Sequence, residues 1–178
     1  MNRSLVVVLA IALVAGCVAA PSVESEYNQG VDAYRVKDYA AARLHWSKAV
    51  EDRELSALNN LGYLLYYGLG GDADEARAIQ LWTQAAELGH SESQWHLGRA
   101  YEDGTGTTQN LHQAYAWYRC AVANAQAGSD NRDAEDQIAQ DASKSLTNLL
   151  KKLPPDQLVV GEQLAKQYID RYAKRAGA

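Results

Sequence analysis

Phenylalanine is absent from this chain of 178 residues, and methionine occurs only once. Eleven tyrosines and four tryptophans therefore supply the aromatic side chains. These rings combine a large apolar body with a polar atom, so they suit a core, a binding surface, or both.

The chain also lacks an excess of positive charge. It has 17 lysines and arginines against 22 aspartates and glutamates, a net charge of −5. A nucleic-acid-binding protein needs a basic surface to neutralise phosphates. The charge balance therefore argues against nucleic acid as a partner.

What the chain does have is an internal repeat. The segment 91–121 restates the segment 55–85 with a constant offset of 36 residues. The repeated positions are Leu61-Gly62 with Leu97-Gly98, Gly68 with Gly104, Gly70 with Gly106, Ala78 with Ala114, and Ala85 with Ala121. A period of this size is typical of stacked two-helix units, each of which buries its apolar face against its neighbours.

Local signals in the second copy agree with a helix pair. Ser91 followed by Gln94 has the spacing of a capping box, which predicts a helix start. Gly98 would then stand inside this helix at a cost of about 1 kcal/mol, which predicts close approach of the paired helix. Gly104-Thr105-Gly106 predicts the turn that ends the first helix. The second helix is predicted from Asn110, with apolar residues at three- and four-residue spacing.

This pattern resembles the Sel-one-like repeat, a longer relative of the tetratricopeptide repeat. The matching positions in 55–90 are Leu61, Gly62, Gly68, Gly70, Ala78, Trp82, Ala85, Ala86 and Gly89. Those in 91–127 are Leu97, Gly98, Tyr101, Gly104, Gly106, Ala114, Trp117, Tyr118 and Ala121. The second copy departs from the pattern at Val122 and Ala125, so its exit turn is expected to differ. The resemblance implies an all-α fold, a right-handed α-solenoid of antiparallel helix pairs.

The flanking segments extend the predicted stack to eight helices. Residues 26–54 have the small and bulky positions of a degenerate tetratricopeptide-like repeat, with Lys37-Asp38 as its tight turn. Residues 128–178 are interpreted as a C-terminal capping helix pair divided at Pro154-Pro155. Its predicted apolar faces are Ile138, Ala142, Ser145, Leu149 and Leu153, then Leu158, Leu164, Ala165, Tyr168, Ile169 and Tyr172.

The N-terminus has the pattern of a lipoprotein signal peptide over residues 1–16. A basic Arg3 precedes an apolar run, and Val14-Ala15-Gly16-Cys17 resembles the bacterial lipobox. The resemblance implies cleavage before Cys17, lipidation of its thiol, and a tether over 17–25. Val18 resembles lipoproteins sent to the outer membrane, so the expected location is the outer membrane, anchored by lipid and facing the periplasm. The alternative is an ordinary secretory signal with an incidental cysteine.

Catalytic candidates are poor. His90 and His96 flank Glu92, but a six-residue separation does not place two imidazoles on one helical face. His45 and His112 are isolated in the sequence, and Cys120 is expected to be a buried, inert thiol. We therefore predict no catalytic residue, no metal and no cofactor.

The more informative feature is a face of the first helix in each unit. In tetratricopeptide-like stacks, positions three before, one after and four after the motif glycine point into the concave groove. Applied here, they are Tyr27, Val31 and Tyr34, then Asn59, Tyr63 and Tyr66, then Trp95, Arg99 and Glu102. Aromatic and arginine side chains are enriched at protein-binding hot spots. The alternative is that some of these tyrosines belong to the core between the helices.

These observations favour a lipid-anchored scaffold or adaptor that binds another envelope protein, or a peptide segment of one, in its groove. By resemblance, such repeat lipoproteins help to assemble envelope machines. The alternatives are an adaptor for host factors or substrates at the cell surface, a hydrolase of cell wall or antibiotic, and a passive structural spacer. The fold does not choose among them.

Overall fold

The computed structural model describes residues 25–127 and 132–173. Within these ranges the chain forms eight α-helices, one short 3₁₀ turn and no strand. The predicted all-α fold is confirmed. The signal peptide, Cys17 and most of the tether lie outside the described residues.

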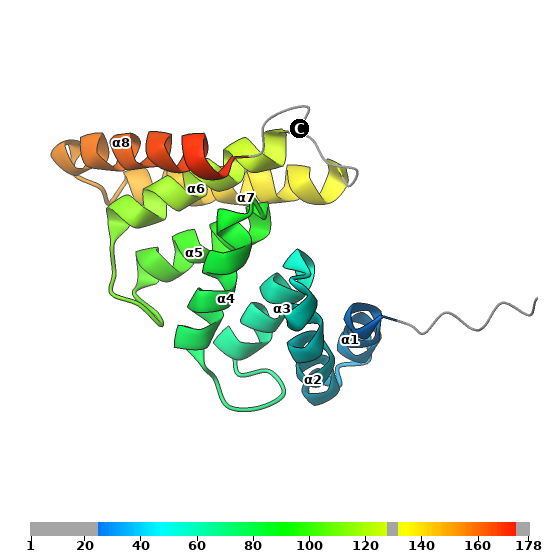
Figure 1. The fold of residues 1–178 in the computed structure, drawn as a ribbon. Helices are drawn as coiled ribbons and strands as arrows, with labels where there is room; N and C mark the ends of the chain where they lie inside the picture. Colours follow the sequence, from blue (N-terminus) through cyan, green and yellow to red (C-terminus); the bar gives the residue numbers. More distant parts are fainter. Residues whose placement is uncertain (1–24, 128–131, 174–178) are drawn as a thin grey trace, which may run out of the picture.

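The first six helices form three antiparallel pairs that stack one upon the next (Figure 1). α1 packs on α2, α3 on α4 and α5 on α6, while α2 contacts α3 and α4 contacts α5. The bounds are α1 Glu26–Arg35, α2 Tyr39–Ala49, the 3₁₀ turn Val50–Asp52, α3 Leu55–Tyr66, α4 Glu75–Glu87, α5 Ser91–Asp103, α6 Leu111–Gln126, α7 Arg132–Leu150 and α8 Pro155–Tyr172.

A glycine in the first helix of each pair admits an aromatic ring from the second. A Cβ atom on Gly98 would lie 2.4 Å from the Tyr118 ring. A Cβ atom on Gly62 would lie 2.6 Å from the Trp82 indole, and one on Gly30 would lie 2.3 Å from the Trp46 indole. The predicted reason for Gly98, close approach of the paired helix, is confirmed.

The glycine-rich loop within each Sel-one-like copy packs against the preceding unit. Gly70 and Gly106 adopt the left-handed region, with φ of 80° and 71°. A Cβ on Gly70 would lie 2.4 Å from the backbone of Tyr39, and one on Gly106 would lie 2.7 Å from Cβ of Glu75. Each loop therefore packs on the start of the second helix of the preceding unit.

The capping box predicted for α5 is wrong, although the helix does begin at Ser91. The capping residue is His90, whose Nδ1 accepts a hydrogen bond from the backbone N–H of Ser93 at 3.2 Å. Ser91 instead donates through Oγ to Glu135 of α7, and Gln94 donates to the carbonyl of Ala86 in α4. Both side chains are buried, so their hydrogen bonds hold neighbouring helices rather than their own helix end.

At the C-terminal end, α6 is the common neighbour of α7 and α8, which both pack along it (Figure 1). The predicted faces contribute Ala142, Leu149, Leu153 and Ala165 to the core. In the first copy, α4 ends just before Gly89, which has a φ of 85°. The equivalent position in the second copy is Ala125, so no glycine turn ends the helix there and α6 continues to Gln126. The exit from the second copy therefore differs, as its sequence predicts.

Cys120 lies in the core between α6 and α8. It is fully buried, its Sγ lies 3.7 Å from the carbonyl oxygen of Tyr168, and burial raises its pKa to about 12. The expected burial of this thiol is confirmed, and its inertness stays a prediction. Among the described residues, no helix combines the length and apolar character needed to cross a membrane.

Candidate protein-binding groove

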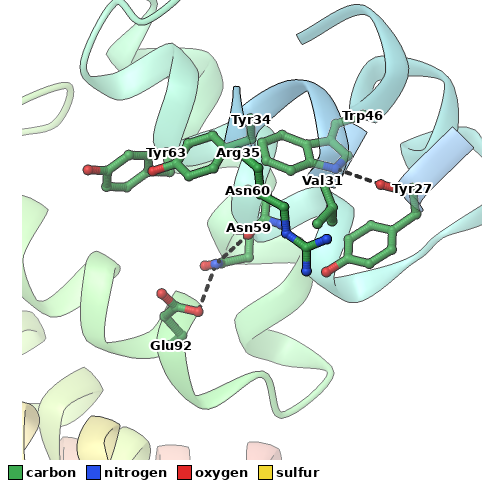
Figure 2. A pocket seen from close by; sticks show the side chains of 9 residues that line it. All are labelled: Tyr27, Val31, Tyr34, Arg35, Trp46, Asn59, Asn60, Tyr63 and Glu92. Atoms are coloured by element: carbon green, nitrogen blue, oxygen red, sulfur yellow. Dashed lines mark hydrogen bonds between the residues drawn. The ribbon is translucent and has the colours of Figure 1, made fainter. Parts of the chain in front are cut away.

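A hollow of about 510 Å³ opens between α1, α3 and α5, and we call it the N-terminal hollow. Figure 2 shows the side chains around it. They are Tyr27, Val31, Tyr34, Arg35, Trp46, Asn59, Asn60, Tyr63 and Glu92. Five of them, namely Tyr27, Val31, Tyr34, Asn59 and Tyr63, are at positions predicted from the glycine spacing.

Aromatic rings from two units form the wall. Tyr34 has 36% of its surface exposed, and its ring lies 5.7 Å from Trp46, centroid to centroid. Tyr63 of α3 lies 4.8 Å from the ring of Tyr67, and burial raises the pKa of its phenol. Trp46 is itself buried and donates its indole N–H to the carbonyl of Tyr27 at 3.2 Å. The wall is therefore supported by packing from behind.

The floor of the hollow is a fixed amide. Asn59 is only 3% exposed, and its Oδ1 accepts a hydrogen bond from the Ser93 hydroxyl at 3.0 Å. Its Nδ2 donates to Oε2 of Glu92 at 3.0 Å, as the dashed line in Figure 2 shows. The indole of Trp82 donates to the Asn59 carbonyl at 3.1 Å. These bonds fix the amide, which in turn orients the Glu92 carboxylate.

Glu92 lies where this hollow meets an adjoining one of about 410 Å³, which Glu135 and His90 also line. Burial raises the Glu92 pKa above its ordinary value, the hydrogen bond from Asn59 lowers it, and the nearby Glu135 carboxylate raises it. His96 Nε2 lies 3.8 Å from the Glu92 carboxylate. Burial lowers the pKa of His96 to about 3, so at neutral pH this neighbour carries no charge.

The remaining predicted groove residues lie elsewhere. Arg99 and Glu102 line a third hollow, of about 440 Å³, beside α7, where Lys152 pairs with Glu102 at 2.8 Å. Trp95 is half-buried against α7 and donates its indole N–H to Ser145 at 3.2 Å. Tyr66 is half-buried, with its ring 5.0 Å from Trp82. The structure thus splits the predicted set, because α7 packs beside the third unit and Tyr66 of the second unit packs on Trp82.

The spacing rule missed Arg35, Trp46, Asn60 and Glu92. Glu92 stands one helical turn before Trp95, so extending each predicted stripe by one turn towards the N-terminus would have found it. Trp46 belongs to the second helix of its unit, and no pattern in the first helices could indicate it. Asn60 and Arg35 lie at the rim, and each directly follows a predicted residue in the sequence.

Three of the four histidines have structural contacts. His90 caps α5, and His45 pairs with Glu26 at 2.7 Å, so His45 is not isolated once the chain folds. The His96 ring stacks on Trp82 with centroids 4.5 Å apart. Across the described ranges, no three side chains among His, Cys, Asp and Glu converge on a point where a metal ion could bind.

Stacked antiparallel helix pairs with a concave aromatic hollow define a helical-repeat solenoid, a class that binds other proteins. The model of the Sel1 repeat family matches residues 55–90 and 91–125. The chain therefore contains two Sel1 repeats, and the predicted resemblance is confirmed. Proteins built from such repeats generally serve as protein-interaction scaffolds.

Two solved bacterial structures have the same fold. One is c5321, a protective antigen present in uropathogenic Escherichia coli strains that displays an SLR fold. It is 31% identical, with a TM-score of 0.72 over 83% of this chain and 30% of that one. Another is a Sel1 repeat protein from Oxalobacter formigenes, 28% identical, with a TM-score of 0.55 over 68% of this chain and 55% of that one. These similarities confirm the α-solenoid architecture.

Human protein sel-1 homolog 2 is 30% identical over 86 residues. The match covers 48% of this chain and 12% of the human protein, so the chain spans only a small part of that relative.

Proposed function

We propose that this chain is a lipid-anchored scaffold of the bacterial cell envelope that binds a segment of another protein in its N-terminal hollow. The scaffold role is supported by the Sel1 repeats, and the envelope location by the lipobox-like sequence that ends at Cys17. The two parts of the proposal are independent and need separate tests.

One observation carries the binding part: the N-terminal hollow combines a rigid aromatic wall with a fixed polar floor. Rings that are already packed lose little entropy on binding, and an oriented amide and carboxylate can select hydrogen-bonding partners. A volume of about 510 Å³ accommodates a few side chains of an extended or helical segment. We propose no catalytic step, because His90 and His96 have structural contacts.

Photocrosslinking in cells tests the binding part. A photoreactive amino acid replaces Tyr34 at the hollow or, as a control, Leu44, which is 58% exposed on α2 outside it. We expect a discrete crosslinked protein from position 34, absent from position 44 and weakened by a second change, Tyr63→Ala. The same products from both positions, or a product insensitive to Tyr63→Ala, would contradict groove binding.

Lipidation is tested by metabolic labelling with a fatty acid and by fractionation of membranes. The Cys17→Ser variant is expected to lose the label and to leave the outer-membrane fraction. Unchanged labelling and fractionation would remove the anchored part of the proposal and leave the binding part intact.

A further inference from the structure

The aromatic wall of the N-terminal hollow ends at a carboxylate that no described cation neutralises. Glu92 forms no ion pair with a lysine or arginine among the described residues, and the His96 ring, whose Nε2 lies 3.8 Å from the carboxylate, is neutral. The side chain is 43% exposed, and Figure 2 shows it next to Asn59 at the edge of the hollow. A ligand in the hollow can therefore reach the carboxylate.

Glu135 strengthens this negative charge from the other side. It comes from α7, lines the adjoining hollow with Glu92, and is held by the Ser91 hydroxyl. Two carboxylates that share a concave surface repel each other, which contributes to the raised pKa of Glu92. A bound cation would relieve this repulsion and lower that pKa again.

Among the residues that the structure describes, Arg35 is the one cation that lines the N-terminal hollow. It donates to Asp32 at 3.1 Å, and its side chain is 73% exposed. Solvent and the paired aspartate therefore screen its charge at the rim. The edge of the hollow at Glu92 therefore stays acidic, in keeping with the net charge of −5.

From this complementarity we infer that the occupant of the N-terminal hollow is a basic peptide segment, whose lysine or arginine lies against the rings of Tyr34 and Tyr63 and pairs with Glu92. An ammonium or guanidinium gains from ring faces and from a carboxylate at the same time. The inference rests on the proposed function and adds the chemistry of the partner.

A random peptide library displayed on phage, selected on the full chain in detergent, tests this. We expect enriched peptides to carry a lysine or arginine at a fixed position. In a synthetic copy of the enriched peptide, replacing this base with a neutral residue (norleucine for lysine, citrulline for arginine) is expected to weaken binding about tenfold, as measured by fluorescence anisotropy.

Two variants at the hollow should act in opposite directions. In Glu92→Gln, the basic peptide and its neutral copy are expected to bind with nearly equal affinity, a ratio near one. Arg35→Gln is expected to raise the affinity for the basic peptide about threefold, because it removes a like charge. Glu162→Gln on α8 removes the same charge far from the hollow and is expected to change nothing.

The two levels of the proposal fail differently. Enriched peptides with no fixed base, whose binding is nevertheless lost in Tyr63→Ala, would overturn the basic partner and leave groove binding standing. Binding that Tyr63→Ala does not affect, or no enrichment at all, would overturn both. A ratio that stays tenfold in Glu92→Gln would assign the base to another site and contradict the inference.

Discussion

The buried His96 is predicted to make the fold sensitive to mild acid. The ring is 4% exposed and stacks on Trp82, with centroids 4.5 Å apart and planes 10° apart. Its Nε2 has no hydrogen-bond partner among the described residues. Burial, with smaller effects from Arg99 and His90, lowers its pKa from 6.5 to about 3. The Glu92 carboxylate, 3.8 Å away and partly exposed, offsets little of this.

The magnitude follows from linkage. Between pH 6.5 and about 3 the unfolded chain binds a proton at this residue that the folded chain does not. The free energy of unfolding therefore falls as pH falls through this window. Above pH 6.5 the ring is neutral in both states and His96 does not lower the stability. Each pH unit is worth about 1.4 kcal/mol, so His96 should remove about 2 kcal/mol between pH 7 and pH 5.

The assay is urea unfolding followed by tryptophan fluorescence at pH 7, 6 and 5, for wild type and His96→Phe. Phenylalanine keeps a ring against Trp82 and cannot titrate, so we expect the variant to lose most of this pH dependence. Its stability at pH 7 should equal or exceed that of wild type, because an unpaired buried nitrogen is removed. Parallel curves for the two proteins from pH 7 to pH 5 would refute the reasoning.

Three further predictions concern packing and the floor of the hollow. Gly98→Ala should lower the free energy of unfolding by about 1–2 kcal/mol in urea titration, because overpacking against Tyr118 outweighs the gain in helix propensity; an unchanged midpoint would contradict the close approach. In a Cys17→Ser background, Cys120 should resist iodoacetamide until the chain is unfolded in urea, and rapid labelling of the native protein would show that it is accessible. Asn59→Ala should raise the pKa of the Glu92 carboxyl, measured by carbon NMR, since it removes a hydrogen bond that favours the charged form; a lowered pKa would show that the amide does not act in this way.

The sequence by itself determined the helices and the pairing of the first six. The offset of 36 residues, the glycines that admit a ring and the glycines that turn the chain are local features, and each has a direct steric reason. They located the Sel1 repeats, predicted the role of Gly98 and placed Tyr27, Tyr34, Asn59 and Tyr63 on one surface. The assignment of these residues to a protein partner stays a prediction.

Only the tertiary structure decided which predicted groove residues share a hollow. Ser91 and Gln94 have the spacing of a capping box, yet the packing of α4 and α7 against α5 draws their hydrogen bonds away from the helix end. α7 also covers the region around Trp95, and Arg99 and Glu102 line a different hollow beside it. A periodic pattern indicates which face of a helix carries the apolar, aromatic and glycine positions. The neighbours on that face come from distant segments, so burial, hydrogen-bond partners and uncompensated charge such as that of Glu92 are set only when the units stack.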